Sequence, residues 1–321
     1  MNRIARHLDI ILIMLFAVCV LRQQAAADTG TSAMAFLKAD SGARASALAG
    51  AYSALGDDAA SMFYNPAGAA FLPRKEVFFS HSVWLEEISL EHFAVVIPVS
   101  RRTSIMAGAA GLIGDVNAYD ADGNSKGSFT SSEVAASGGL SHSISGTIHV
   151  AAQAKIYSQK ADSNSGKAFG VDAGIIYSSG SYKVGFSALN VGNKIKVGNT
   201  AFELPRTIRL GASYEILSGL KAGADYVSYV DSGAHTAFGC EYRLPILSED
   251  KAMIVRGGYS SGRDKNTGSG FVGGVGFATQ DISIDYSFTP FGDLGSAHRF
   301  SLSLRFGSDR RYFEEDYDDR K

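Results

Sequence analysis

The chain has 321 residues, a formal net charge of −2, 36 glycines, 6 prolines and 2 cysteines. A net charge so close to zero gives no general attraction to nucleic acid or to acidic lipid, so we expect no nucleic-acid partner. Glycine at this level without a collagen period, beside 19 phenylalanines and 14 tyrosines, is typical of tightly turning β-strands rather than of disorder.

Residues 1–27 have the form of a secretory signal peptide. A basic start and an apolar run over residues 8–21 precede Ala25-Ala26-Ala27. The apolar run is shorter than the ~20 residues that a membrane-spanning helix needs. We therefore predict export with cleavage after Ala27. Cleavage removes Cys19 and leaves Cys240 as the single cysteine, so no internal disulfide is expected in an oxidising compartment.

Residues 28–72 are predicted to form a compact plug, or hatch, of short helices and turns. Residues 36–72 are rich in alanine and lack period-two order, and the small side chains of residues 42–52 permit a close approach to a barrel wall. Asp57-Asp58 ahead of a short apolar run indicates a cap and a short helix. Asn65-Pro66-Ala67-Gly68 then indicates a turn, because proline fixes φ and glycine permits positive φ.

Residues 73–307 alternate apolar and polar side chains, which places successive side chains on opposite faces of a sheet. We predict about 14 antiparallel strands, most of ~8–13 residues, which match the ~9–11 of a tilted transmembrane strand and exceed the ~5–6 of soluble strands. The expected fold is an all-β transmembrane barrel in which Ile284 and Leu302 face lipid while Asp285 and Ser303 face the lumen. The predicted strands are 75–84, 88–98, 102–113, 129–141, 146–158, 168–178, 181–189, 205–216, 219–230, 235–244, 251–260, 269–279, 281–288 and 297–306.

The predicted connections alternate between short turns and longer loops, as in outer-membrane barrels, whose short turns face the periplasm. An even number of strands then puts both chain ends in the periplasm. Residues 308–321, with six acidic and four basic side chains, are expected to be a charged, disordered periplasmic tail. The expected location is the bacterial outer membrane. The longer predicted connections are 115–128, 159–167, 190–204, 261–268 and 289–297, and residues 245–250 form a longish connection on the periplasmic side.

No catalytic, metal or cofactor site is predicted. The six histidines of the mature chain show no metal-ligand spacing, and no Gly-x-Ser-x-Gly elbow accompanies them. Residues 120–124 offer alternating oxygen ligands, but a calcium loop would need glycine at Ser125 and glutamate at Ser131, so a hairpin tip is favoured. We expect the chain not to be an enzyme.

The plug segment resembles the N-terminal signature of the PorV/PorQ family of outer-membrane proteins, which is itself similar to the FadL-type fatty-acid channels. The resemblance implies a 14-stranded barrel with a hatch in its lumen. Residues 46–49 depart from the Leu-Gly-Met-Gly that is more usual ahead of Gly50, although small side chains are largely kept. The residues that carry the resemblance, and that we take as the candidate plug motif, are Gly42, Arg44, Gly50, Tyr52, Asp57, Asp58, Asn65, Pro66, Ala67 and Gly68.

Two functions follow from the resemblance. Some family members serve the type IX secretion system, which predicts a docking or cargo-shuttle barrel with secretion-system proteins or exported cargo as partners besides outer-membrane lipid. The alternative is a FadL-like channel for small hydrophobic molecules. The loops are modest and none is a long apolar segment, which favours docking. Arg44, Asp57 and Asp58 could bind a ligand at the plug, but pairing within the plug or with charges of the lumen is the favoured interpretation. The lumen charges considered are Lys155, Asp172, Arg209, Asp225 and Asp285.

Overall fold

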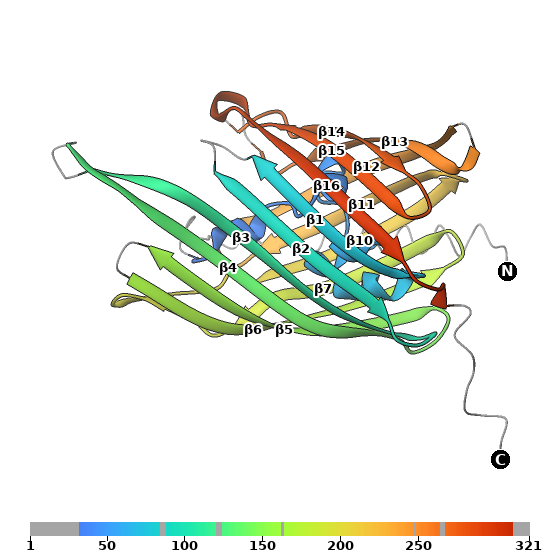
Figure 1. Ribbon diagram of the computed structural model, residues 1–321, viewed down its shortest axis with the longest axis horizontal. Coiled ribbons are helices and arrows are strands. Elements are labelled where there is room, and N and C mark those ends of the chain that lie inside the picture. The colour runs from blue at the N-terminus through green and yellow to red at the C-terminus, as the bar shows by residue number, and fades with distance from the viewer. Residues whose placement is uncertain are drawn as a thin grey trace, which may run out of the picture.

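A computed structural model describes residues 32–83, 88–119, 124–161, 164–246, 248–263 and 267–310 of the chain. Fourteen strands form one closed antiparallel barrel around short helices of the N-terminal segment (Figure 1). The predicted class, a 14-stranded barrel with a helical and turn plug, is confirmed. The predicted signal peptide, residues 120–123 of the hairpin tip and the tail from residue 311 lie outside the described residues.

The barrel strands pair with their neighbours along the chain, and β1 pairs with β16 to close the wall. One connection carries an extra hairpin of β8 (Ile195–Val197) and β9 (Thr200–Phe202), so that β7 pairs with β10. The barrel strands are β1 (Lys75–Val83), β2 (Ser89–Pro98), β3 (Thr103–Tyr119), β4 (Ser125–Ser143), β5 (Ile148–Ala161), β6 (Asn164–Ser179), β7 (Tyr182–Gly192), β10 (Thr207–Leu217), β11 (Leu220–Tyr229), β12 (Gly233–Ile246), β13 (Ser248–Ser260), β14 (Phe271–Ala278), β15 (Ile282–Pro290) and β16 (Ser296–Phe306).

The two ends of the barrel differ in their connections. We call the end with residues 193–206 between β7 and β10 the loop end, and the end with residues 180–181 between β6 and β7 the turn end. The predicted connections 115–128, 159–167 and 245–250 are shorter than expected, because the strands on both sides of each continue into them. The sequence there no longer alternates apolar and polar residues, so the pattern that marks a strand is lost before the strand ends.

Burial alternates along the strands as the sequence predicts. On β15, Ile284 is 53% exposed on the outward face while its neighbour Asp285 is buried on the lumen side. On β16, Phe300 points outward and Ser301 and Ser303 point inward. An outward apolar face and an inward polar face are the arrangement that a hydrocarbon surrounding requires.

The N-terminal segment contains η1 (Ala35–Lys38), α2 (Ala43–Ala47), η2 (Ala59–Phe63) and η3 (Pro66–Phe71), and a further short helix, η5 (Gly292–Leu294), joins β15 to β16. Residues 32–74, here called the plug, pass through the lumen (Figure 1). No helix among the described residues is long and apolar enough to cross a bilayer.

The plug starts at one end of the barrel and finishes at the other. Ser32 bridges Glu203 in the connection that defines the loop end. Arg310, the last described residue, donates from its backbone N–H to Pro73 and from its guanidinium to the carbonyl of Ser100, both at the turn end. Residues 32 and 310 thus lie at opposite ends of the barrel, because the plug passes through the lumen once before the 14 strands begin. The placement of both chain ends in the periplasm stays a prediction.

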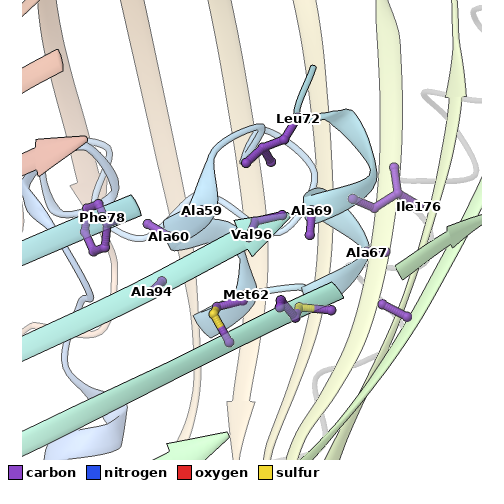
Figure 2. Packing of buried hydrophobic residues seen from close by; sticks show 12 residues of the cluster. Ala59, Ala60, Met62, Ala67, Ala69, Leu72, Phe78, Ala94, Val96 and Ile176 are labelled. Carbon is purple, nitrogen blue, oxygen red and sulfur yellow. The ribbon is translucent and has the colours of Figure 1, made fainter. Parts of the chain in front are cut away.

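The main apolar core lies inside the barrel, between the plug and the wall. Figure 2 shows Met62, Ala67 and Leu72 of the plug packed toward Val96 and Ile176 of the wall. These side chains are buried almost completely. The lumen is thus a packed core in its centre rather than an open pore, and the plug adds apolar burial that pairing between strands alone does not provide.

A belt of inward glycines lets the plug lie directly on the wall. At six of these positions a Cβ atom would come closer than 3.0 Å to a plug atom, which real side chains essentially never do, and at Gly223 it would lie 3.0 Å from the flexible end of the Leu55 side chain. The plug atoms concerned belong to residues 47–55 and to Asn65. This close approach is a second reason for the high glycine content, besides the tight turning of β-strands. The belt runs over seven neighbouring strands at Gly174, Gly185, Gly211, Gly223, Gly239, Gly258 and Gly274.

Candidate functional site in the barrel lumen

Asn65 fixes the last turn of the plug to the wall. Its side-chain oxygen accepts from the backbone N–H of Ala67 at 3.1 Å, which caps the start of η3. Its side-chain amide donates to the carbonyls of Ser53 at 2.9 Å, Ile175 at 3.2 Å and Phe186 at 3.4 Å. One buried side chain therefore joins two parts of the plug to β6 and β7.

Pro66 and Gly68 shape the helix that Asn65 caps. Pro66 occupies the first position of η3, where a missing N–H costs nothing. Gly68 does not have the positive φ that the sequence argument gave as its reason. Glycine is required there by space, because a Cβ atom would lie 2.6 Å from the side chain of Ser61 and 2.8 Å from the carbonyl oxygen of Gly56.

Arg44, on α2, is the centre of a charged network. Its guanidinium donates to Asp57 at 2.7 Å and Asp58 at 3.0 Å in the plug, and makes two parallel hydrogen bonds, of 3.0 and 2.6 Å, to Glu241 on β12. Lys221 on β11 also binds Asp57 at 3.0 Å. Burial opposes ionisation of Asp57, but the charges of Arg44 and Lys221 outweigh it and hold the pKa of that carboxyl well below its usual range. The favoured interpretation, pairing within the plug and with lumen charges, describes these contacts.

Two tyrosines complete the inner layer of the plug. The Tyr52 hydroxyl donates to Asp58 at 2.5 Å, and the Arg44 guanidinium lies 5.4 Å from the Tyr52 ring centroid. The rings of Tyr52 and Tyr64 meet edge to face at 5.2 Å. Together with Leu48 they belong to one buried apolar cluster of the plug, here called the inner layer.

A second anchor holds residues 50–53. Asp225 on β11 accepts from the N–H of Ser53 at 3.0 Å and from its hydroxyl, and pairs with Arg209 at 3.2 Å. Arg209 in turn donates to the carbonyl of Gly50 at 2.5 Å. Gly42 and Gly50 both have positive φ, of 89° and 79°, at the start of α2 and just after its end. Because the backbone N–H of Ala43 also donates to the Ser301 hydroxyl at 2.8 Å, the plug backbone is tied to the wall at the start of α2 and after its end.

The sequence did not find every partner of the plug. Glu241 was missed, although its place between outward Cys240 and Tyr242 marks it as an inward charge. Lys155 and Asp172 were considered as plug partners but pair with each other in the wall at 2.6 Å. Arg310 was placed in a disordered tail, yet its guanidinium is buried against the plug carbonyl of Ala70.

A cavity lies on each side of the plug. The loop-end cavity has a volume of about 370 Å³ and is lined by Lys38, Asp40, Arg209, Arg263 and Arg299 among others. The turn-end cavity has a volume of about 440 Å³ and includes the Arg44 network, Lys183, Arg256 and Arg305. The layer of Leu48, Tyr52 and Tyr64 belongs to neither lining. The two cavities thus lie toward opposite ends of the plug.

A closed 14-stranded barrel with an N-terminal plug defines the class of protein. The same fold occurs in the toluene transporter TodX of Pseudomonas putida, with a TM-score of 0.55 and 12% identity over 82% of this chain and 97% of that one. The monoaromatic hydrocarbon channel CymD gives 0.56 and 12% over 83% and 97%. A FadL homologue of Pseudomonas aeruginosa gives 0.54 and 12% over 83% and 98%. At this identity the likeness establishes the fold.

Sequence comparison adds one match. The model of the uncharacterised protein family UPF0164 matches residues 17–109, which include the plug and the first two strands. No curated protein matches the chain. The matched part contains all ten residues of the candidate plug motif.

Proposed function

We propose that the chain is an outer-membrane channel of the FadL-like kind, which takes up small organic molecules past its plug. The observation that carries the proposal is the pair of cavities toward opposite ends of the plug, with Leu48, Tyr52 and Tyr64 of the inner layer in neither lining. The fold shared with channels for hydrocarbons supports it. We place the loop end outside the cell and the turn end in the periplasm, with an exported, processed N-terminus and a periplasmic tail.

In this proposal transport requires residues 48–55 to move relative to the wall. This stretch contains Leu48 and Tyr52 of the inner layer and rests on the glycine belt, where its backbone contacts are short. The Arg44 network and Asp225 hold it from either side. The anchors are polar and therefore exchangeable with water, whereas the barrel wall is a continuous ladder of backbone pairs. Movement of the plug therefore costs less free energy than opening of the barrel wall.

A reversible cross-link tests the proposal. A Cβ atom at Gly223 would lie 3.5 Å from the Cβ of Leu55, at the short end of the range for a disulfide. The variant Gly223→Cys/Leu55→Cys, with Cys240→Ser to remove the native thiol, is expected to lose uptake of a monoaromatic solute into proteoliposomes when oxidised and to regain it on reduction. The matched control carries Leu55→Cys and Cys240→Ser only. Uptake that persists in the oxidised pair contradicts the proposal.

The docking or cargo-shuttle role implied by the PorV/PorQ resemblance is the second candidate. One observation favours it: Arg310 joins the plug to the wall at the turn end, because its guanidinium donates to the carbonyls of Ala70 in the plug and Ser100 in the β2–β3 turn. A plug fixed in this way suits a barrel that binds partners on its outer surfaces rather than one that transports solutes through its lumen. Co-purification in mild detergent separates the two, since docking predicts stoichiometric protein partners and a channel predicts none.

A further inference from the structure

The turn-end cavity has cations near its mouth and carboxylates deeper inside. Lys183 and Lys221 are the second residues of β7 and β11, and Arg305 is the last but one of β16, so all three lie at the turn end of the wall. The side chains of Lys221 and Arg305 are 34% and 25% exposed, whereas those of Glu241 and Asp285 are 8% and 7% exposed. The cavity therefore presents positive charge to solvent.

Lys183 is a cation of this mouth that has no carboxylate partner among the described residues. Its ammonium lies 3.9 Å from the ring centroid of Phe71, and no carboxylate oxygen of those residues lies within 4.0 Å of it. Asp57 is the most exposed carboxylate of the lining and already binds Lys221 at 3.0 Å. Arg243 lines the same cavity from β12 and is exposed. A lysine beside a ring can hold a carboxylate whose own chain brings an apolar group to that ring.

The chain end starts at the rim of this cavity. The backbone N–H of Arg310 donates to the carbonyl of Pro73 at 2.7 Å, and Pro73 belongs to the cavity lining. Residues 312–319 follow and lie outside the described part of the chain. Their sequence is Tyr-Phe-Glu-Glu-Asp-Tyr-Asp-Asp, with five acidic, three aromatic and no basic residues. Eight extended residues span up to about 26 Å, which is long enough to cross a cavity of about 440 Å³.

We propose that the mouth of the turn-end cavity binds an acidic peptide segment, and that its occupant is residues 312–319 of the same chain. The carboxylates of this segment supply partners for Lys183 and for the exposed Arg243, and its aromatic side chains match the apolar surface of Phe71 and Pro73 in the lining. The attachment at Pro73 favours this segment over an acidic segment of another protein, because a short tether gives an effective concentration in the millimolar range.

The inference goes beyond the proposed function. The segment covers the turn-end face of the plug whether solutes pass the plug or partners dock on the outside of the barrel. In a channel, the bound tail closes the turn-end entrance until it is displaced. In a docking barrel, an acidic segment of a partner gains access by replacing the tail.

Binding of a peptide to the full-length protein in lipid nanodiscs tests the inference. The probe is a fluorescent peptide with the sequence of residues 312–319, and fluorescence anisotropy measures its dissociation constant. In the parent, the tethered tail competes with the probe. A neutral-tail variant keeps the full length of the chain but has amides in place of the five tail carboxylates, so its cavity is open to the probe. The substitutions of the neutral-tail variant are Glu314→Gln, Glu315→Gln, Asp316→Asn, Asp318→Asn and Asp319→Asn.

We expect the neutral-tail variant to bind the probe about tenfold more tightly than the parent, which is the ratio for an effective concentration of about 1 mM and a dissociation constant of about 100 µM. Binding to the variant should weaken as salt is added. Equally tight binding to parent and variant would overturn the tail as the occupant and assign the cavity to an acidic segment of another protein. Absence of binding to both would overturn the site itself.

A substitution in the mouth tests the residue that carries the argument. In the neutral-tail variant, Lys183→Gln should weaken binding of the probe about tenfold, and Lys183→Arg should keep most of it. The matched control is Arg102→Gln, which removes an exposed cation of the β2–β3 turn outside the cavity lining and should have no effect. Heat-modifiable gel mobility verifies that each variant folds. An equal loss in Arg102→Gln would overturn the inference, because general attraction of charges would then explain the binding.

Cross-linking of the parent locates the tail directly. A carbodiimide joins a lysine amine to a carboxylate as an amide, and mass spectrometry of peptides identifies the joined residues. We expect links from Lys183 or Lys221 to residues 314–319 within one chain, and their loss in the presence of excess probe. Links from the tail to lysines outside the cavity alone, or to lysines of a second copy alone, would overturn the inference.

Discussion

Replacing Arg44 with methionine removes the centre of the charged network while keeping a side chain of similar length. Asp57, Asp58 and Glu241 would then face one another without the guanidinium that now lies 2.6–3.0 Å from their oxygens. The four side chains are between 8% and 25% exposed, so solvent screens their charges only in part. Breaking a buried ion pair by removing one partner destabilises by about 3–5 kcal/mol. We expect that loss to fall on the attachment of the plug and not on the barrel.

A loss of this size raises the population of a displaced plug about a hundredfold or more. Ion conductance in planar bilayers measures the displacement, and hydrogen exchange of the amides of residues 45–55 locates it. Arg44→Lys, which keeps one positive charge but loses the two parallel hydrogen bonds to Glu241, should lie between the parent and Arg44→Met. Adding Glu241→Gln to Arg44→Met should recover part of the loss. A parent-like conductance and parent-like exchange in Arg44→Met would refute the assignment of the network as the anchor of the plug.

Three further outcomes are expected. Gly68→Val should displace the plug and raise conductance yet leave heat-modifiable mobility intact, because its Cβ would meet Ser61 at 2.6 Å while the wall pairs are untouched; loss of the folded barrel would contradict this. In refolding from urea into lipid vesicles, Ile284→Arg should cost about 2–4 kcal/mol, whereas Ser303→Thr on the lumen side should be nearly neutral; equal costs would argue against a membrane-facing outer surface. The pKa of Asp57 is lowered below its ordinary value of 3.8 in the folded protein, so its contribution to plug attachment is complete above pH 3.8 and is lost as pH falls toward the folded-state pKa. Conductance measured from pH 7 to pH 3 should therefore rise only at the acid end. Asp57→Asn should raise conductance already at neutral pH.

The strands could be predicted from the sequence because one physical requirement acts on every residue of the wall. In the part of the wall whose outer surface is apolar, each side chain faces either outward or inward. Outward positions carry apolar residues such as Ile284, and inward positions carry polar residues such as Asp285. The prediction loses the ends of strands such as β3 and β4, which continue beyond this part of the wall. There, backbone hydrogen bonds maintain the strand and no face has to be apolar, so the alternation stops.

The contacts of the plug could not be predicted in the same way. Arg44, Asp57 and Asp58 were recognised as candidates, but their partners lie on strands nearly two hundred residues away, such as Glu241 on β12. The inward direction of the Glu241 side chain could be inferred from its neighbours. Its position along the barrel axis could not, because it depends on the register of every strand from β1 to β12. The same holds for Asp40 and Arg263, which meet at the loop-end cavity only because the plug enters the lumen from that end.

The glycine belt and the charged anchors together explain how a plug can be placed accurately and still be able to move. Glycines such as Gly239 and Gly258 bring the backbone of Leu48 against the wall, but a glycine surface buries little apolar area, so this contact fixes position more than it stabilises. The contacts of Arg44 and Asp225 fix which part of the plug lies against which strand of the wall. Their ion pairs add little net stability, because the cost of removing the charges from water opposes the attraction between them. Residues 48–55 are therefore positioned accurately but held with a modest free energy, whereas residues 59–72 of the same plug are held by the large apolar side chains of the core. A gate needs this division, because one stretch can then move while the rest of the plug stays attached to the wall.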